Sequence, residues 1–533
     1  MTGVPRVLTY SIAARITVFG QAGAGPTRMP VLERACRPGR RGFYMGAHRS
    51  RASRLRHCWR SLHERPPRCN VAARTTCQEE TNMRSEREIS TSSVTRRGFL
   101  KQVGAAAGTA GLAPALSSPF VSTALAQTKT LKVLQWSHFV PQYDKWFDSF
   151  ATAWGKKNGV TVTVDHIPHL ELPARAAAEV SAGAGHDIFA FSGSGGPHLY
   201  EKHVVDLSSL VSEVEKKHGK VHQIGRQIGY NEDTKVWSAL PAYYISFPGL
   251  YRKDLWDETG VKPDTWEDIR VGGAKLKAKG TPIGISLGHS VDPNLSYRSM
   301  LWSYGASECD ETGKRVTLNS KETLEVVKLV RAIYKDAMEP EVLSWDDASN
   351  NRLLASGRGS WIHNPISAYR SIQKANPELA DKISVWKTPA GPVRRLACGS
   401  PNSYGVWRFA RSKDTAIEFL RYWTDNWVAV FEASTGYNHP LFENLVPKPM
   451  PILSNDPTSH PADKLQVLET ADEWHATYGY PGPAGPASDE VADNFIIVDM
   501  MAKAATDKAT PEEAVAWAQK EIELIYKKWS EVL

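Results

Sequence analysis

The chain has 533 residues and a formal net charge of +8, but this charge is unevenly distributed. Residues 1–126 carry 20 Lys and Arg against six acidic residues, and subtracting their +14 leaves −6 for residues 127–533. An acidic remainder removes the main support for nucleic-acid binding. Outside the first 126 residues only Cys309 and Cys398 remain of six cysteines, which excludes a disulfide-rich scaffold and leaves room for one bridge.

Residues 95–101, TRRGFLK, fit the twin-arginine export pattern, with Arg96 and Arg97 as the arginine pair. A weakly apolar, uncharged stretch follows, and small residues end it at Ala126. We therefore expect cleavage near Ala126 and a periplasmic protein. Met83 opens a lead-in of ordinary length, so we expect translation to start there and residues 1–82 to be a mis-assigned extension. The alternative for residues 1–82 is a basic tail that binds nucleic acid or membrane.

The segment 127–240 alternates strand and helix patterns. Residues 131–137 form a short apolar run, residues 143–159 carry aromatic residues at helical spacing, and residues 160–167 alternate with β-branched side chains. A helix over 174–182 and a strand opening into a Gly-Ser loop at 186–196 follow. This order predicts a mixed sheet covered by helices, with ligands bound at the carboxyl ends of its strands.

Residues 236–260 read as an extended crossing segment, and a second α/β pattern begins after them. Its helices are expected after a cap at Asp264 or Thr265 and after Ser320, with strands in 281–288, 357–365 and 382–390. A second crossing is expected at 399–409, then one helix over 413–435 and a C-terminal helix with Pro511 in its first turn. Most Trp residues at helical spacing, Trp146, Trp154, Trp423 and Trp427 among them, are assigned to packing.

Four blocks of this sequence resemble the family 1 extracellular solute-binding proteins of ABC importers, the maltose-binding-protein-like group. The blocks are LPAYYISFPGLYRKDLWDETGVKPDTWEDI, GASECDETGKRVTLNSKETLEVVKLV, ASGRGSWIHNP and TPEEAVAWAQKEI. The resemblance implies two α/β lobes joined by crossing strands, which close over a small solute. It also implies an ABC permease and its cytoplasmic ATPase as partners. The sequence departs from the family pattern after Asn364, where Pro365 and Ile366 stand in place of Gly-Pro-Trp.

We therefore predict an α/β, two-lobe periplasmic binding protein fold of type II-like topology, each lobe a mixed sheet flanked by helices. The expected segments are a signal peptide at 83–126, lobe 1 at 127–240 and 399–445, and lobe 2 at 241–398. The C-terminal helical segment, 446–533, is expected to pack mainly on lobe 2.

Candidate ligand-binding residues are those at strand ends, on the crossing segments and in late loops. Strand alternation places Tyr244 and Ser246 on one face of the first crossing and Tyr243 on the other, so only one set can line the site. The full predicted set is Trp136, His138, Ser192, Gly193, Tyr244, Ser246, His289, His363, Asn364, Asn402, Tyr437 and Tyr480.

The expected ligand is a sugar, oligosaccharide or polyol, bound by a monomer that is not an enzyme. The sequence has no clustered His and Cys set and no cofactor motif, so neither a metal nor a cofactor is expected. One alternative is a secreted serine hydrolase, since GISLG places Ser286 in a G-x-S-x-G motif, although HSVDPNL after it reads as a poor helix start. Another is a binding protein that feeds a receptor rather than a transporter.

Overall fold

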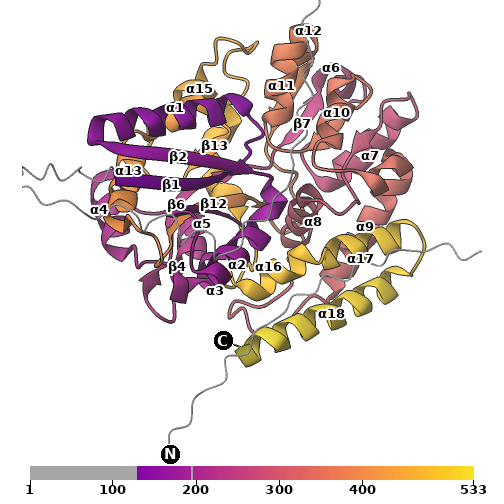
Figure 1. The fold of residues 1–533 in the computed structure, drawn as a ribbon. Coiled ribbons are helices and arrows are strands. Elements are labelled where there is room, and N and C mark those ends of the chain that lie inside the picture. The colour runs from indigo at the N-terminus through magenta and orange to yellow at the C-terminus, as the bar shows by residue number, and fades with distance from the viewer. Residues whose placement is uncertain (1–128, 194–195, 533) are drawn as a thin grey trace, which may run out of the picture. The chain divides into compact units, whose positions relative to one another are not determined.

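The computed structural model describes residues 129–193 and 196–532, all within the unit Ser117–Leu533. The predicted start at Met83, the signal residues Arg96 and Arg97, and the cleavage site at Ala126 lie outside the described residues. A six-stranded sheet forms the first lobe (Figure 1). Its strands, in spatial order, are β13 (Asn438–Pro440), β6 (Leu240–Ile245), β12 (Ser400–Val406), β3 (Ile188–Ser192), β1 (Lys129–Trp136) and β2 (Val160–Ile167).

The first lobe combines a parallel half with an antiparallel half. β1 pairs in parallel with β2 and β3, while β12 runs antiparallel to both β3 and β6, with a register shift after Asn402. Helix α1 (Pro141–Asn158) packs along β2, starting at a proline and ending at Gly159 in the left-handed conformation (φ 65°). The remaining helices here are α2 (Leu172–Ala182), α3 (Gly196–Leu199), α4 (Ser208–His218), α5 (Gln223–Gly229), α13 (Lys413–Asp425) and α14 (Trp427–Ala433).

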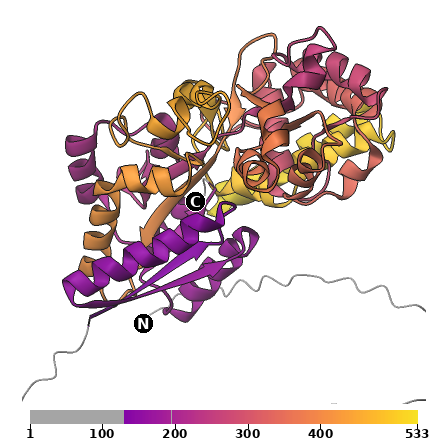
Figure 2. The ribbon, with the colours of Figure 1, turned by 90° about the horizontal axis from the view of Figure 1, so that it is seen from above.

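A four-stranded sheet forms the second lobe, in the order β10 (Ile383–Trp386), β7 (Gly249–Arg252), β9 (Trp361–His363) and β8 (Ile283–Gly284). Its flanking helices are α6 (Lys253–Asp257), α7 (Trp266–Lys277), α8 (Val291–Ser303), α9 (Lys321–Ala337), α10 (Ser349–Ala355), α11 (Ser367–Ala375) and α12 (Pro377–Lys382). Figure 2 shows the elements of the two sheets gathered into two groups. Both sheets are mixed and flanked by helices, which confirms the predicted fold class.

The chain crosses between the two sheets twice, from β6 to β7 and from β10 to β12. A small sheet of β11 (Ala397–Cys398) and β14 (His475–Ala476) lies at the second crossing. At the first crossing, the Phe247 N–H donates to Nε2 of His475 at 3.0 Å. This bond ties the two crossings together. A further pair, β4 (Tyr230–Asn231) and β5 (Val236–Trp237), closes a hairpin in the first lobe.

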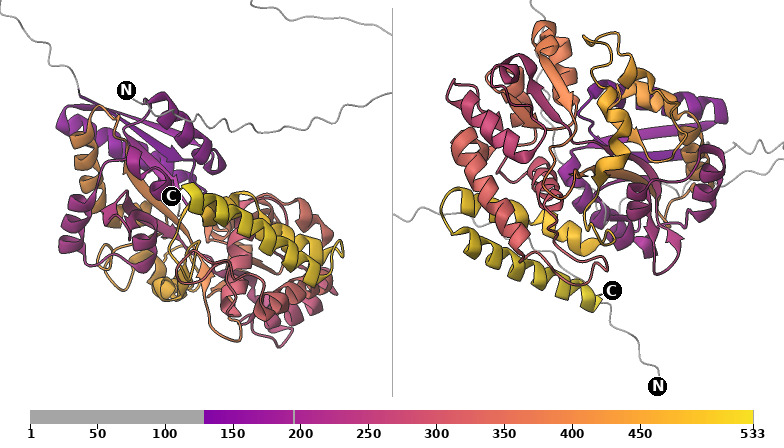
Figure 3. Two further views of the ribbon diagram at one scale, coloured as in Figure 1. Left: turned by 90° about the horizontal axis from the view of Figure 1, so that it is seen from below. Right: turned by 180° about the vertical axis from the view of Figure 1, so that it is seen from behind.

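The C-terminal part of the chain contacts both lobes. Helices α16 (Pro486–Asp493), α17 (Ile496–Ala505) and α18 (Pro511–Val532), yellow in Figure 3, lie beside the second lobe, where α17 packs on α8 and α9. The segment before them holds α15 (Pro451–Ser454) and the 3₁₀ helix η5 (Gln466–Trp474). It packs against the first lobe: Ile452 on α15 lies so close to Gly436, just before β13, that a Cβ added to Gly436 would be 2.9 Å from Ile452 Cγ2. Other 3₁₀ turns are η2 (His169–Glu171), η3 (Glu201–His203) and η4 (Pro340–Ser344).

Several local predictions are confirmed. Thr265 caps α7 in a reciprocal capping box with Asp268, and the Ser320 side chain accepts from the Thr323 N–H at the start of α9. Pro511 opens α18. The indoles of Trp154, Trp423 and Trp427 are buried in the core, and Trp146 packs against it.

Three predictions of local structure were wrong. Residues 253–257 are helical rather than extended, because the buried Trp256 anchors a single turn, α6. The helix expected over 413–435 breaks at Asn426, whose side-chain Nδ2 donates to the Tyr422 carbonyl at 2.7 Å and competes with the helical pattern. Residues 291–303 do form a helix, α8, because Pro293 lies in the first turn, where a missing N–H costs nothing.

Candidate functional site

The carboxyl end of β1 supplies an aromatic wall in the first lobe. The Trp136 Nε1–H donates to the Tyr243 hydroxyl at 2.7 Å, and the Trp136 and His138 rings lie 4.7 Å apart. His138 Nδ1 accepts from the Val140 N–H, so the proton is on Nε2, which donates to Asn438 Oδ1 at 2.9 Å. Burial lowers the pKa of His138 to about 4, so the ring is neutral at neutral pH.

The end of β3 continues this wall. Ser192 hydrogen-bonds His169 Nε2, and the sheet places Asn402 directly beside Ser192 on one side and Tyr243 on the other. Gly193 turns the chain with φ 89°, where its N–H donates to the Pro401 carbonyl at 3.1 Å. Within the described part of the chain, Asn402 Oδ1 and Asn438 Nδ2 are buried without a hydrogen-bond partner. Unused polar atoms of this kind suit a bound polar ligand.

Tyr437 joins the first wall to the second lobe. Its ring packs edge-on against His138, with the ring centroids 4.9 Å apart, and its hydroxyl lies near the Ser367 side chain at the start of α11. Burial raises the pKa of Tyr437, and the nearby charges of Asp292 and Asp347 raise it further. The Tyr437 hydroxyl is therefore close enough to these two carboxyl groups of the second lobe for their charges to affect its pKa.

The second wall is a chain of carboxylate and amide groups. Asn350 Nδ2 donates to Asp292 Oδ2 at 2.6 Å and to Asn364 Oδ1 at 2.8 Å, and Asn364 Nδ2 donates to Asn351 Oδ1 at 2.7 Å. Asp347 accepts from the Asp292 N–H at 3.0 Å and so caps the start of α8. Burial, and secondarily the charge of Asp347, raises the pKa of Asp292 well above its usual range. This wall offers several acceptors and no cation of its own in the contacts described.

We call these two groups of residues together the interlobe site. Six of its members are among the predicted ligand-binding residues, and their ligand roles stay predictions. The sequence analysis did not single out the other six, which are His169, Asp292, Asp347, Asn350, Ser367 and Asn438. His169 opens the 3₁₀ turn η2, two residues after the carboxyl end of β2, so the strand-end rule applied to β1 and β3 identifies it as well. Asp292 lies in the first turn of α8, within the HSVDPNL stretch that was expected to be a poor helix start, so the sequence did not show which way its side chain faces. The members are Trp136, His138, His169, Ser192, Asn402, Tyr437, Asn438, Asp292, Asp347, Asn350, Asn364 and Ser367.

Comparison of the sequence with models of protein families identifies the family of the chain. The model described as bacterial extracellular solute-binding protein matches residues 140–426 of the chain. The chain belongs to this family. A probable ABC transporter-binding protein of Deinococcus radiodurans is 24% identical to this solute-binding protein over 293 residues, which cover 51% of the chain and 67% of the relative.

Solved structures share the fold of this solute-binding protein at low sequence identity. Maltose-bound MalE3 of T. maritima has a TM-score of 0.62 and 19% identity, covering 74% of this chain and 99% of its own. An ABC transporter solute-binding protein of Thermotoga lettingae bound with α-D-tagatose has a TM-score of 0.62 and 19% identity, covering 75% and 100%. A sugar transporter protein of Arthrobacter chlorophenolicus with bound laminaribiose has a TM-score of 0.63 and 14% identity, covering 74% and 98%. These matches show the two-lobe fold.

Two predicted residues of the solute-binding protein face away from Trp136. Tyr243 points toward Trp136, whereas the Tyr244 ring lies 5.1 Å from His439 and 5.5 Å from His475. Ser246 Oγ hydrogen-bonds His439 Nε2 at 3.0 Å. The first crossing thus has two faces, as strand alternation requires, and the ligand roles of Tyr244 and Ser246 stay predictions.

Three further predicted residues of the solute-binding protein lie apart from the two walls. His363 is buried, and its ring nitrogens bond Ser296 Oγ at 2.9 Å and Thr388 Oγ1 at 3.0 Å. His289 is 58% exposed, stacks on Phe495 and borders a cavity of about 800 Å³ beside α17 and α18. The Tyr480 hydroxyl accepts from Arg394 Nη1 at 2.5 Å. Their ligand roles also stay predictions.

The G-x-S-x-G motif places Ser286 between β8 and α8 in a buried position. Its Oγ accepts from the Gly288 N–H at 3.1 Å and donates to the Trp345 carbonyl at 3.5 Å. Neither partner is a base that would activate a serine hydroxyl.

The two remaining cysteines, Cys309 and Cys398, are buried free thiols rather than a disulfide. Burial raises the pKa of Cys309 to about 12. In residues 129–193 and 196–532, no His, Cys, Asp and Glu group is arranged to hold a metal ion. Over the same residues, no helix has the length and apolar character needed to cross a membrane.

Proposed function

We propose that the chain is the substrate-binding component of an ABC-type importer, which captures a sugar, oligosaccharide or polyol at the interlobe site. The observation that carries this proposal is the pairing of aromatic rings from one lobe with carboxylates and amides from the other, in a member of a solute-binding family. Aromatic faces suit the apolar faces of sugar rings, and carboxylates accept strong hydrogen bonds from hydroxyl groups. The sugar-bound relatives support this ligand class.

In this proposal the lobes close about the crossing segments near Phe247 and His475 and deliver the solute to a permease with a cytoplasmic ATPase. The protein acts as an exported monomer without cofactor or catalysis. The lobe boundaries are those proposed from the sequence, 127–240 with 399–445 and 241–398, with 446–533 as the C-terminal segment, except that β6 (Leu240–Ile245) belongs to the first sheet and moves the first boundary beyond Ile245. The members of the interlobe site are its ligand-binding residues.

A thermal-shift screen over sugars, polyols and small organic acids tests this proposal. A ligand that binds only the folded state adds about 2.7 kcal/mol of stability at a hundredfold excess over Kd. We expect sugars or polyols to raise the melting temperature without being consumed. Stabilisation by small acids alone would contradict the proposed ligand class, and turnover that is lost in Ser286→Ala would contradict the binding role.

Asp292→Asn is expected to weaken binding of the best ligand about ten- to hundredfold, because a hydrogen bond to a charged acceptor contributes roughly 1.5–3 kcal/mol. The same variant should melt no lower than the parent without ligand, because it removes a buried carboxylate whose pKa is raised. Calorimetric titration and melting curves measure both effects.

Asp336→Asn is the matched control for Asp292→Asn, since Asp336 forms an exposed pair with Arg270 on the second lobe. It should bind the ligand as the parent does. Unchanged ligand affinity in Asp292→Asn would remove Asp292 from the site.

Replacing Arg96 and Arg97 together by lysine is expected to abolish export, because the twin-arginine pathway requires the arginine pair. The precursor should then accumulate in the cytoplasm, whereas the parent reaches the periplasm with a new N-terminus near residue 127. Cell fractionation with N-terminal sequencing measures both. Equal periplasmic amounts of the two proteins would show that another route is used.

A further inference from the structure

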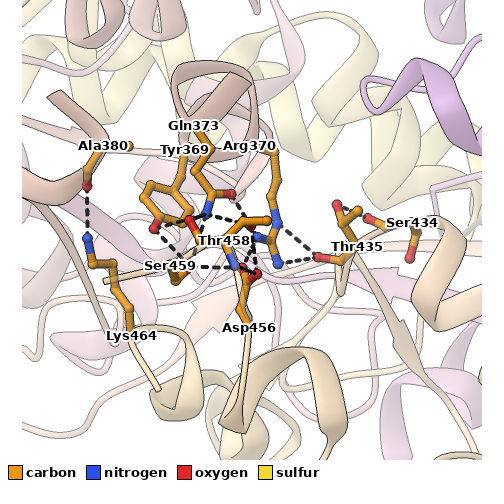
Figure 4. A network of polar contacts seen from close by, with 10 residues as sticks. All are labelled: Tyr369, Arg370, Gln373, Ala380, Ser434, Thr435, Asp456, Thr458, Ser459 and Lys464. Carbon is orange, nitrogen blue, oxygen red and sulfur yellow. Dashed lines mark hydrogen bonds and ion pairs between the residues drawn. The ribbon is translucent and has the colours of Figure 1, made fainter. Parts of the chain in front are cut away.

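A polar cluster connects the two lobes beside the interlobe site (Figure 4). On one side stand α11 and α12, whose chain runs between strands β9 and β10 of the second sheet. On the other side stand residues 434–464, which include β13, the strand that pairs with β6 at the edge of the first sheet. Within this segment, Ile452 lies against Gly436 just before β13. The contacts between these two sides therefore cross from one lobe to the other.

Arg370 on α11 is the centre of this cluster. Its Nε and Nη2 groups donate to the Thr435 carbonyl at 3.0 and 2.7 Å, and its Nη1 group pairs with the Asp456 carboxylate. The Arg370 and Asp456 side chains are only 9% and 3% exposed. The planar guanidinium thus holds two separate points of the first lobe at once, which an ammonium group cannot do with the same geometry.

The other polar groups of the cluster complete its hydrogen bonds. Asp456 accepts from Ser459 Oγ at 2.8 Å and from Thr458 Oγ1 at 2.7 Å. Gln373 on α11 donates to the Thr458 carbonyl at 2.9 Å and accepts from Arg370 at 2.8 Å. Because each member is satisfied, the cluster specifies one relative position of the two sides.

The ion pair of Arg370 and Asp456 can form and break reversibly because its net contribution to stability is small. Bringing two ions out of water costs about as much as their attraction returns, so a buried pair adds little net stability. If the lobes separate, both ions regain water rather than remaining buried alone. The cluster can therefore fix the geometry of closure without holding the lobes shut.

The cluster is also close to the interlobe site along the chain. Ser367 lies three residues before Arg370, and Tyr437 lies two residues after Thr435. Separating α11 from residues 434–437 would break the contacts of Arg370 with Thr435 and would move Ser367 away from Tyr437 in the same movement.

We propose that Arg370 is a positioning residue for lobe closure: it clasps Thr435 and Asp456 across the lobes, and this clasp forms and breaks with the interlobe site. This proposal rests on the proposed function in that closure serves ligand capture. The first test of the closure proposal requires no ligand, so this proposal and the proposed binding function can be contradicted separately.

Hydrogen–deuterium exchange of the full chain without ligand tests the clasp in Asp456→Asn. We expect exchange to rise about tenfold in residues 367–375 and 434–440 while β1 and β3 keep the parent rate, as for a local opening. Glu308→Gln, which breaks the buried Arg298 pair within the second lobe, is the matched control. In this control, exchange in residues 367–375 and 434–440 should not rise more than in the rest of the chain. If Asp456→Asn does not fold, Gln373→Ala, a half-buried site, carries the same test.

Uniform acceleration over the whole first lobe, or no change in the two segments, would overturn the proposal. With a sugar or polyol from the screen, Asp456→Asn should raise the dissociation rate about tenfold and leave the association rate nearly unchanged, because closure follows encounter. Arg370→Lys keeps the charge but loses the planar guanidinium that donates to Thr435 and Asp456 at once, so it should give an intermediate dissociation rate. A parent-like dissociation rate in both variants would also overturn the proposal.

Discussion

Acidification from pH 7 to pH 4 is expected to unfold the protein in the absence of ligand. Burial lowers the pKa of His138 and His169 to about 4, and that of His363, His439 and His475 to about 3. The ordinary value is about 6.5, so the unfolded chain binds more protons than the folded one below that pH. The free energy of unfolding therefore keeps its full value, as far as these histidines are concerned, above about pH 6.5, and it decreases as the pH falls toward 3 to 4.

The carboxyl groups of Asp144, Asp292, Asp347 and Asp493 and the imidazole of His186 act in the opposite direction, since their pKa values are raised in the folded protein. They offset only part of the loss, because the pKa values of His198 and His222 are lowered as well. The net effect is on the order of several kcal/mol, comparable with the whole stability of an ordinary domain.

Tryptophan fluorescence and circular dichroism against pH measure this transition. His363→Gln should move the midpoint to lower pH, because it removes one buried titrating ring. His289→Gln is the control and should not move the midpoint, because His289 is mostly exposed. A protein that keeps its fold down to pH 3.5 would contradict the expectation.

Glu308→Gln is expected to lower the free energy of unfolding by about 3–5 kcal/mol, because it leaves a buried guanidinium without its counterion. Arg298 and Glu308 are each 1% exposed, and Arg298 Nη2 lies 2.9 Å from Glu308 Oε2. Arg298 also donates to Asn294 Oδ1 at 2.9 Å, and the Tyr526 hydroxyl of α18 donates to Glu308 at 3.3 Å. The pair therefore joins α8 to the C-terminal helix.

Urea unfolding measures the loss as a shift of the midpoint at constant slope. The double variant Arg298→Met with Glu308→Met should lose much less, because no lone charge remains buried. Glu232→Gln, in an exposed pair with Arg226, should change the stability by less than about 1 kcal/mol. Equal stability of Glu308→Gln and the parent would mean that water reaches Arg298.

The sequence predicted the local elements well where a single helix or strand carried its own signal. The capping residues Thr265 and Ser320 and the C-terminal helix at Pro511 are examples. It failed where a tertiary contact decided the outcome. The single turn of α6 exists because Trp256 is buried, and no local pattern at residues 253–257 shows that burial.

The interlobe site was predictable only in part, because its two walls come from distant parts of the chain. Trp136, His138 and Ser192 follow from the rule that ligands meet strand ends in α/β sheets. Asp292 and Asn350 belong to helices whose inner face is set by packing of the second lobe. The sequence does not show how α8 and α10 are aligned, so the contact between Asp292 and Asn350 could be found only in the structure.

The order in which the sheets can be completed differs between the lobes. All strands of the second sheet lie between Gly249 and Trp386, whereas the first sheet needs β13, and His138 bonds Asn438 across 300 residues of sequence. During synthesis the second sheet can therefore assemble while the first still lacks its central strand β12 and its edge strand β13. Because contacts so distant in sequence form slowly, completion of the first lobe is expected to limit the folding rate.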